Sequence, residues 1–417
     1  MIGIVPARDS AGVSSSISGP RCRAGWHVKS ATARSINIPS RPLAAQNERR
    51  SLMTSQLDLG SSIPAARTAV GQRTATSRVV HLVGSLPKDL APDQRTRMQW
   101  VLDRSGGARL SAVPCDDDPS WIIEYLRSRA QVPAFEVVRD GECADYADIP
   151  VYRVRQGHRL TIEDVSLGRP EEVYRAVTTW RELGGPAALP PVQASVPSPL
   201  DLAMFTLGDP PRVLRHFPVF ERMIATEVAE IAHRHGPGEV VLQLESPVVL
   251  YLLHRAPRPA RSAIAHLLAH QLARVIVSAP RSARWTLHLC YGDLGHVSLF
   301  GPEDLGPAVL VANALAAHLR TYGRRMPTVH IPMAHGDQPP LVDAAAYAPL
   351  HGLARGIGVI AGCVDERQPE LSAKALSFAE TALGQRVVGV AAACGHGRRT
   401  PTEAAFNIEL ARLLAGS

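Results

Sequence analysis

The chain has 417 residues, 45% of them hydrophobic, and no apolar run reaches the roughly 18 to 20 residues that cross a bilayer. Its six cysteines are scattered, which excludes a dense disulfide framework and favours a reducing, cytoplasmic compartment. The formal charge of +7 lies in residues 1–76, with ten Lys or Arg against three acids, whereas the rest holds 35 of each sign, so a nucleic-acid surface is not expected.

Residues 1–76 are rich in Ser, Ala and Arg and lack hydrophobic periodicity, which predicts a disordered basic leader. The composition is similar to that of an organelle transit peptide. Two simpler interpretations stay open: a disordered tail, or translation from an upstream start with the working start at Met53. The remaining residues, 77–417, are predicted to form the catalytic domain.

Strands and helices alternate in the first half of this domain. The predicted order is strand "RVVHLVGSLP" from Arg78, helix 93–106, strand "ARLSAVP" and helix 118–130. Residues 134–167 differ, because alternating apolar and polar residues in "FEVVRDGE" and "VYRVRQG" predict a small antiparallel excursion. A helix at 170–183 and a strand at 191–195 resume the alternation.

The second half repeats strand and helix. Strands are predicted at 239–247, "RWTLHLCYG", "TVHIPMAHG", "GIGVIAGCV" and "RVVGVAAACG". Helices are predicted at 258–274, 303–321, 341–354 and 369–384. The last helix begins at Thr400, where Thr as N-cap, Pro401 at N1 and Glu403 at N3 make a capping box.

Roughly eight strand–helix units predict a (β/α)8 barrel, with an open doubly wound sheet as the alternative. The apolar, β-branched runs are typical of strands buried on both faces. In such a barrel, catalytic side chains lie at the C-terminal ends of the strands. Those ends carry Gly84-Ser85, the acids at 116–118, Glu245, His288-x-Cys290, His330 to His335, Cys363 and Cys394.

His288 and Cys290 lie two residues apart at the end of one strand, so their side chains point to the same face. Zinc prefers neutral imidazole and thiolate, and three protein ligands with an open position are typical of a catalytic site. For the pair alone, a packed cysteine beside a hydrogen-bonded histidine is the alternative. Cys394, at another strand end, offers a third soft ligand at the same mouth.

Other strand-end groups are candidates for binding substrate. Glu245 offers a carboxylate for a substrate amine or for proton transfer, with a surface loop acid as the alternative. Gly84 and Ser85 offer backbone amides and a hydroxyl, or form an ordinary turn. Asp117 is expected to reach substrate, although the acids at 116–118 also suit an N-cap.

At these residues the chain resembles the C-terminal catalytic half of cobalamin-independent methionine synthase, in a wider group that includes uroporphyrinogen decarboxylase. "HLVGSLP" is similar to the family's opening strand, "VLQLESP" to "VVQIDEP", "LHLCYGD" to "THMCYSN", and "AAACGHGRRTPTEA" to "NPDCGLKTRKYTEV". The resemblance covers most of 78–417. It implies zinc ligands at His288, Cys290 and Cys394, and substrate contacts at Gly84, Ser85 and Glu245.

Two positions depart from the family pattern. The family's fourth zinc ligand, the Glu of "ISIEN", falls on Pro332, so His330 and His335 are the candidate substitutes. The proton-donating His of "YDIHS" falls on Cys363, a thiol that would donate a proton, bind metal or do neither. The N-terminal half of full-length methionine synthases is missing, so thiol activation is expected ahead of methionine synthesis itself.

The resemblance implies a methyltransferase that uses Zn2+ to hold a homocysteine-like thiol as thiolate while a methyl or alkyl group is transferred to it. The expected donor is a methyl-folate, 5-methyltetrahydrofolate, and the expected partners are small molecules, with neither nucleic acid nor membrane. Two alternatives stay open: a metal-free decarboxylase or lyase of the uroporphyrinogen decarboxylase type, and a non-catalytic relative, the latter motivated by Pro332 and Cys363.

Overall fold

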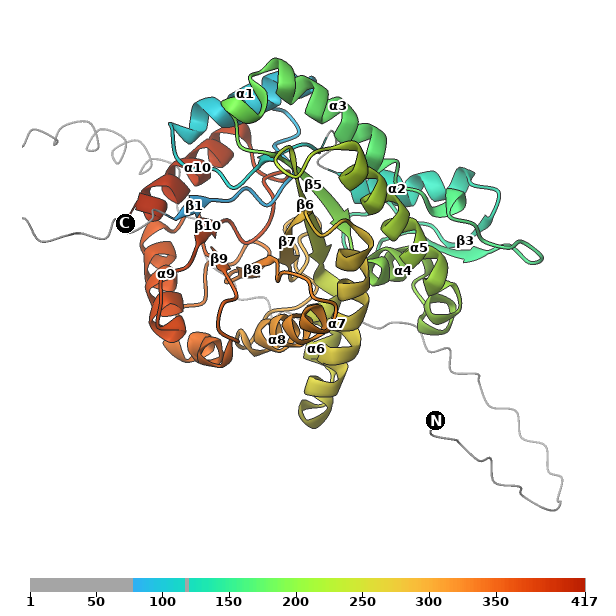
Figure 1. Cartoon of the computed structure of the whole chain (residues 1–417). Coiled ribbons are helices and arrows are strands. Elements are labelled where there is room, and N and C mark those ends of the chain that lie inside the picture. Colours follow the sequence, from blue (N-terminus) through green and yellow to red (C-terminus); the bar gives the residue numbers. More distant parts are fainter. Residues whose placement is uncertain (1–77, 117–119, 417) are drawn as a thin grey trace, which may run out of the picture. The chain divides into compact units, whose positions relative to one another are not determined.

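Eight parallel strands form the central sheet, in the order β1-β10-β9-β8-β7-β6-β5-β2 (Figure 1). They are β1 (Val79–Val80), β2 (Val113–Pro114), β5 (Val192–Pro197), β6 (Val240–Ser246), β7 (Arg284–Leu289), β8 (Thr328–Pro332), β9 (Val359–Gly362) and β10 (Gly389–Ala391). The computed structural model describes residues 78–116 and 120–416, so the predicted leader and Asp117 lie outside the described residues.

The two ends of the sheet are joined by a short parallel pairing at Val80 and Leu110. The Val80 N–H donates to the Arg109 carbonyl at 2.9 Å, and the Ser111 N–H donates to the Val80 carbonyl at 2.9 Å. The sheet is therefore closed into a barrel, as the sequence predicted, and the open sheet is excluded.

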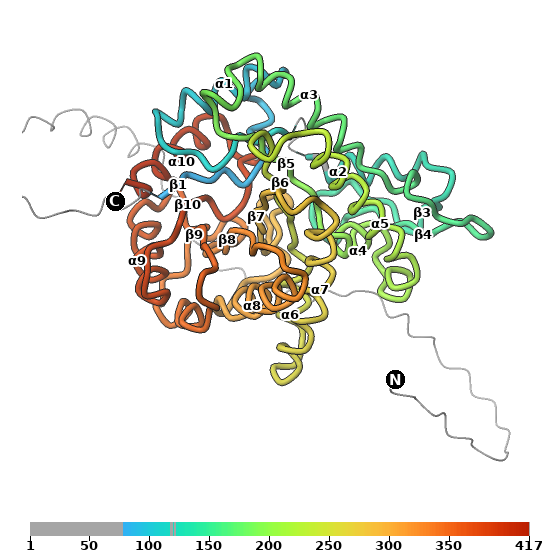
Figure 2. The backbone as a smooth tube through the Cα atoms, viewed as in Figure 1, coloured from blue at the N-terminus to red at the C-terminus, as the bar shows by residue number. Residues whose placement is uncertain are grey.

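Helices surround the barrel, as the tube in Figure 2 shows. They are α1 (Gln94–Ser105), α2 (Trp121–Ser128), α3 (Arg169–Glu182), α4 (Pro199–Leu207), α5 (Pro210–Arg234), α6 (Pro247–Arg255), α7 (Arg261–Ser278), α8 (Gly306–Thr321), α9 (Pro369–Leu383) and α10 (Pro401–Gly416). The predicted helix at 341–354 is instead a 3-10 helix, η5 (Ala344–Gly352). Within the described residues, no helix has the length and apolarity needed to cross a membrane.

The predicted excursion is a two-stranded antiparallel sheet of β3 (Phe135–Arg139) and β4 (Val151–Val154). It lies outside the barrel next to α2, at the cyan edge of the fold in Figure 1. Tyr152 on β4 is buried, and its hydroxyl donates to the Leu126 carbonyl of α2 at 2.7 Å. This contact anchors the hairpin, so that the loop between its strands has a fixed base.

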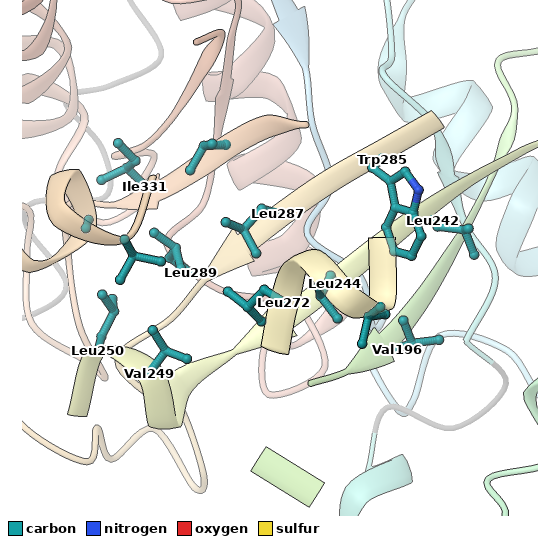
Figure 3. Packing of buried hydrophobic residues seen from close by; sticks show 14 of the residues in the cluster. Val196, Leu242, Leu244, Val249, Leu250, Leu272, Trp285, Leu287, Leu289 and Ile331 are labelled. Atoms are coloured by element: carbon teal, nitrogen blue, oxygen red, sulfur yellow. The ribbon is translucent and has the colours of Figure 1, made fainter. Parts of the chain in front are cut away.

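Strand alternation separates two kinds of side chain. Residues that point outward are apolar and pack against the helices; examples on β6, β7 and β8 are Leu242, Leu244, Leu287, Leu289 and Ile331 (Figure 3). Residues between them point into the barrel, because successive side chains on a strand alternate in direction. The strand register aligns three of these inward residues across neighbouring strands, with Glu245 opposite His288 and His288 opposite His330.

The barrel interior is polar below its mouth. Gln193 donates to the Leu82 and Val83 carbonyls at 3.0 and 2.8 Å, and Gln243 also donates to the Val83 carbonyl. These carbonyls belong to the chain that leaves β1, so the two glutamines fix the backbone just before Gly84. A buried amide that loses such partners costs about 1–3 kcal/mol, which makes this layer a rigid floor for the residues above it.

Candidate metal centre

Three ligand-type side chains converge at the mouth of the barrel. His288 lies near the end of β7, Cys290 follows that strand, and Cys394 follows β10. One ligand atom from each residue lies within 4.8 Å of the other two. His288 and Cys290 are buried, and Cys394 is half-buried. The structure therefore brings together the three residues that the His-x-Cys spacing and the late cysteine predicted.

The geometry of the two cysteines suits a tetrahedral metal ion. Both thiols are free, and the Cys290 Sγ lies 3.8 Å from the Cys394 Sγ, well beyond the length of a disulfide bond. Two thiolates bound to one tetrahedral zinc at about 2.3 Å would lie about 3.8 Å apart. With one imidazole, the set would supply three protein ligands, the number typical of a catalytic zinc site.

His330 fixes the orientation of His288. The His330 Nε2 lies 2.9 Å from the Ala392 carbonyl, which can only accept, so this nitrogen carries the hydrogen. Burial lowers the pKa of His330 to about 4, so the ring is neutral and its Nδ1 is an acceptor. The His288 Nδ1 lies 2.8 Å from that Nδ1 and must donate to it. The lone pair of His288 is therefore on Nε2.

Burial shifts the pKa values of the side chains in the cluster. Burial lowers the pKa of His288 well below its usual value, so its imidazole is neutral, the form that binds metal. The contact with Cys394, followed by burial, raises the pKa of Cys290 well above its usual range. Two thiols this close resist ionisation together unless a positive charge lies between them. The adjacent thiols and the neutral imidazole are thus the groups expected at a site that binds a cation.

The first of two pockets at the mouth connects the cluster with Gly84, Ser85 and Glu245. Burial, with the neighbouring charge of Asp116, raises the pKa of Glu245 to about 7. Its Oε1 accepts from Gln243 at 2.9 Å. The pocket has an apolar wall supplied mainly by α2, the hairpin loop and α4; its members include Ile122, Ile123, Leu126, Ile149 and Phe205.

Tyr146, from the loop between β3 and β4, lines the same pocket. Its hydroxyl accepts from the Asp293 N–H at 2.8 Å, which ties the hairpin to the chain segment that follows Cys290. Burial, with the nearby Cys290, raises the pKa of Tyr146 far above its usual value, so the phenol is neutral. The hairpin thus contributes directly to the surroundings of the cluster.

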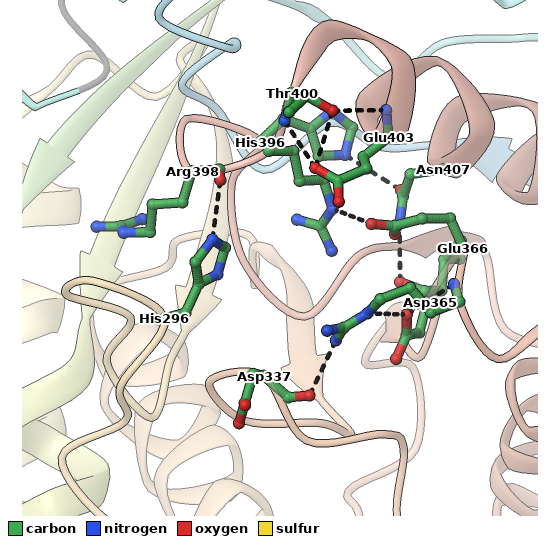
Figure 4. A network of polar contacts seen from close by, with 12 residues as sticks. His296, Asp337, Asp365, Glu366, His396, Arg398, Thr400, Glu403 and Asn407 are labelled. Carbon is green, nitrogen blue, oxygen red and sulfur yellow. Dashed lines mark hydrogen bonds and ion pairs between the residues drawn. The ribbon is translucent and has the colours of Figure 1, made fainter. Parts of the chain in front are cut away.

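A second pocket shares Cys290, Gly292, Asp293 and Cys394 with the first. The two pockets therefore meet at the candidate metal centre. Polar contacts build part of its wall (Figure 4). Glu366 accepts from Arg399 Nε at 2.9 Å and from Asn407 at 2.7 Å.

The start of α10 adds to the same network. The Thr400 N–H donates to Glu403 at 2.8 Å, and the Glu403 N–H donates to the Thr400 hydroxyl at 3.2 Å. These reciprocal bonds are those of the predicted capping box. They hold the first turn of α10 beside the second pocket, which Glu403 helps to line.

Three residues predicted as further metal ligands or as a reactive thiol lie outside the cluster. His330 uses both ring nitrogens in the contacts described above, and His335 bonds Ser298 at 3.1 Å and lines the second pocket. Cys363 is buried in the hydrophobic core and lines neither pocket. Ile360 packs toward the barrel interior with Val83, so strand alternation turns Cys363 toward the helices.

Several contacts that shape the site were not predicted. Asp116 accepts from the Ser85 N–H, Asp293 lies between the two pockets, and Tyr146 comes from the excursion. One signal in the sequence indicates polar side chains inside the barrel: Gln243 and Glu245 lie two residues apart within an otherwise apolar run. The contributions of Tyr146 and Asp293 depend on how loops distant in sequence meet, which no local pattern encodes.

The fold and the cluster define a parallel β/α barrel with a thiol-rich candidate metal centre at its mouth. No family model matches the chain, and no curated protein matches it. Among solved structures it is similar to a B12-independent methionine synthase from Shewanella sp. W3-18-1 in complex with selenomethionine. The TM-score is 0.52 at 14% identity, over 82% of this chain and 97% of that chain. The predicted resemblance is thereby confirmed for the fold.

Proposed function

We propose that this protein is a zinc-dependent transferase that moves a methyl or alkyl group onto a substrate thiol. The observation that carries the proposal is the cluster of His288, Cys290 and Cys394, whose two cysteines line both pockets. A shared wall lets an acceptor in one pocket and a donor in the other approach the same atoms. The similar solved structure, a methionine synthase, supports the same reaction class.

His288, Cys290 and Cys394 would hold the zinc ion. When bound there, zinc supplies the positive charge that keeps a substrate thiol ionised near neutral pH. A carbon–sulfur bond forms as the bond between the methyl group and its donor breaks. The thiol loses its proton, and the departing donor atom takes one up. A homocysteine-like thiol and a methyl-folate are the acceptor and donor that the family resemblance implies.

The protein's own residues position the acceptor. Glu245, Gly84 and Ser85 line the first pocket, where they can hold the acceptor's polar group. The apolar wall contributed by α2, including Ile122 and Ile123, excludes water from the sulfur. The substrate sulfur would then lie beside His288, Cys290 and Cys394.

Metal content tests the proposal. The purified full chain is expected to hold about one equivalent of zinc by elemental analysis. The double variant Cys290→Ser/Cys394→Ser should lose it, because serine hydroxyls are poor zinc ligands. Cys143→Ser is the matched control: Cys143 lines the first pocket outside the cluster, so that variant should keep the metal.

Activity is then assayed with 5-methyltetrahydrofolate and a panel of thiols, with methyl-sulfur formation followed by mass spectrometry. Full metal retention in the double variant would contradict the proposal. Release of CO2 from a carboxylated substrate by zinc-free protein would instead support the decarboxylase alternative.

A further inference from the structure

The part of the first pocket around Glu245 is rich in carboxylates. Glu245 and Asp201 both line it. Asp116 lies directly behind Gly84, where a Cβ built on that glycine would come within 3.1 Å of its Oδ2. Three acidic side chains thus gather where a substrate's polar group would lie.

The Ser85 backbone amide is already occupied. Its N–H donates to the Asp116 Oδ2 at 3.2 Å, and Asp116 is buried beside Arg169, whose Nη1 lies 3.2 Å from the Oδ1. A carboxylate from the protein therefore takes the donor that a substrate carboxylate would need. Moving Asp116 aside would break a buried ion pair, which is costly.

The hydrogen-bond donors around Asp201 also bond a carboxylate of the protein. The Ser246 hydroxyl donates to Asp201 at 2.6 Å, the Val248 N–H donates at 2.6 Å, and the Ser198 hydroxyl also donates to it. These groups face the protein's own carboxylate. These three donors are therefore not available to a substrate carboxylate.

The cations of the pocket do not change this balance. Of the described residues that line it, Arg398 is the only Lys or Arg, and its Nη1 lies 3.4 Å from the Asp293 Oδ2. Arg169 is paired with Asp116 and also lies 2.5 Å from Glu172. A substrate carboxylate placed near Glu245 would therefore meet like charge without a compensating partner.

We propose that the acceptor is an aminothiol: a thiol that carries an ammonium group on a short carbon chain and lacks a carboxylate. The ammonium group binds among Glu245, Asp201 and the neighbouring acceptor atoms. The carbon chain lies along the apolar wall, and the sulfur reaches the cluster. This inference rests on the proposed function and names the class of acceptor for it.

Four matched thiols separate the two charges. Three of them, 3-aminopropane-1-thiol, homocysteine and 4-sulfanylbutanoic acid, share a three-carbon spacing between the sulfur and a polar group. The fourth, propane-1-thiol, has the same carbon chain without a polar group. The full chain is loaded with Co2+ in place of zinc, and thiol binding is titrated through the sulfur-to-cobalt charge-transfer band. No methyl donor is needed, so the readout is independent of turnover.

The aminothiol is expected to bind at least about tenfold more tightly than homocysteine or propane-1-thiol, because hydrogen bonds to charged groups contribute strongly. The 4-sulfanylbutanoic acid should bind most weakly. In Glu245→Gln the advantage of the aminothiol over propane-1-thiol should shrink, whereas Asp337→Asn, an exposed change in the second pocket, should preserve it.

Tighter binding of homocysteine than of the aminothiol to wild-type protein would overturn this inference and leave the proposed function standing. A chain that takes up no cobalt, or shows no charge-transfer band with any thiol, would overturn both. The comparison among thiols uses wild-type protein, so it is decisive even where a variant fails to fold.

Discussion

The lone pair that His288 presents to the cluster is determined by a residue outside it. His330 must accept from His288 because its other nitrogen donates to the Ala392 carbonyl. Partners of this kind set the tautomer and ring orientation of metal-binding histidines. Without the acceptor, the His288 ring could place its hydrogen on Nε2 and block the lone pair.

His330→Leu is therefore expected to weaken zinc binding by about 10- to 100-fold, the usual effect of losing such a partner. His330→Gln should recover part of this loss, because its amide oxygen can accept from the His288 Nδ1. Affinity is measured by competition with a chromophoric chelator. His335→Leu is the control and should bind zinc normally; equal losses in both leucine variants would refute the positioning role.

Residue identity and spacing predicted the cluster but not its surroundings. His288, Cys290 and Cys394 could be proposed because strand ends of a barrel share one mouth. Motif alignment predicts a proton donor, a metal ligand or neither at Cys363, and the position of this thiol in the core follows from alternation along β9. From the sequence alone, Asp116 also suits a helix cap. Its contact with Ser85 could not be predicted, because it joins segments about thirty residues apart.

At the scale of elements, the chain after β7 connects the cluster to the hairpin. Gly292 has a φ of +83°, and its N–H lies 3.1 Å from the Cys290 Sγ. A Cβ at this position would overlap the Tyr146 hydroxyl and press on Leu299. A side chain of any size at 292 would therefore push the hairpin loop away from the cluster.

Gly292→Ala is expected to reduce both stability and zinc affinity. The matched control is Gly157→Ala, since Gly157 has a nearly identical φ of +81° but open space around it. The control should lose only the backbone penalty of roughly 1–2 kcal/mol for a non-glycine residue in the left-handed region. Gly292→Ala should lose a further 1–3 kcal/mol or so from overpacking. Urea unfolding and zinc competition are the measurements; equal behaviour of both variants would argue against a link between hairpin and cluster.

Elements were predicted well where apolar runs were short and poorly where proline intervened. The strands of the second half and the antiparallel excursion are present as expected. No prediction covered α4 and α5, whose first residues are Pro199 and Pro210, because proline starts helices as well as ending them. In η5, Pro349 removes a backbone donor, and the segment forms a 3-10 helix.

At the scale of the whole barrel, Arg78 connects the beginning of the described chain to its end. Its guanidinium contacts Glu380 of α9 through two bonds of 2.8 and 2.7 Å and donates to the Leu414 carbonyl of α10 at 3.0 Å. Figure 1 shows the blue β1 beside the red α10. The contact thus secures the seam where the first strand joins the last.

Arg78→Ala is expected to lower the free energy of unfolding by about 2 kcal/mol, because Glu380 and the Leu414 carbonyl lose a largely buried partner. Arg95→Ala is the control. It removes an ion pair with Glu182 in which both side chains are more than half exposed, so the loss should stay below about 1 kcal/mol. Urea unfolding of the full chain measures the free energy of unfolding of both variants. Equal losses would show that the Arg78 contacts add no more stability than an exposed ion pair.

The wall shared by the two pockets also bears on the order of events in the proposed reaction. A site with room for one reactant would require the first to give up its group and leave before the second could bind. Two pockets that share Cys290 and Cys394 would allow both reactants to be present together. The group can then pass directly between them, and the protein need never carry it.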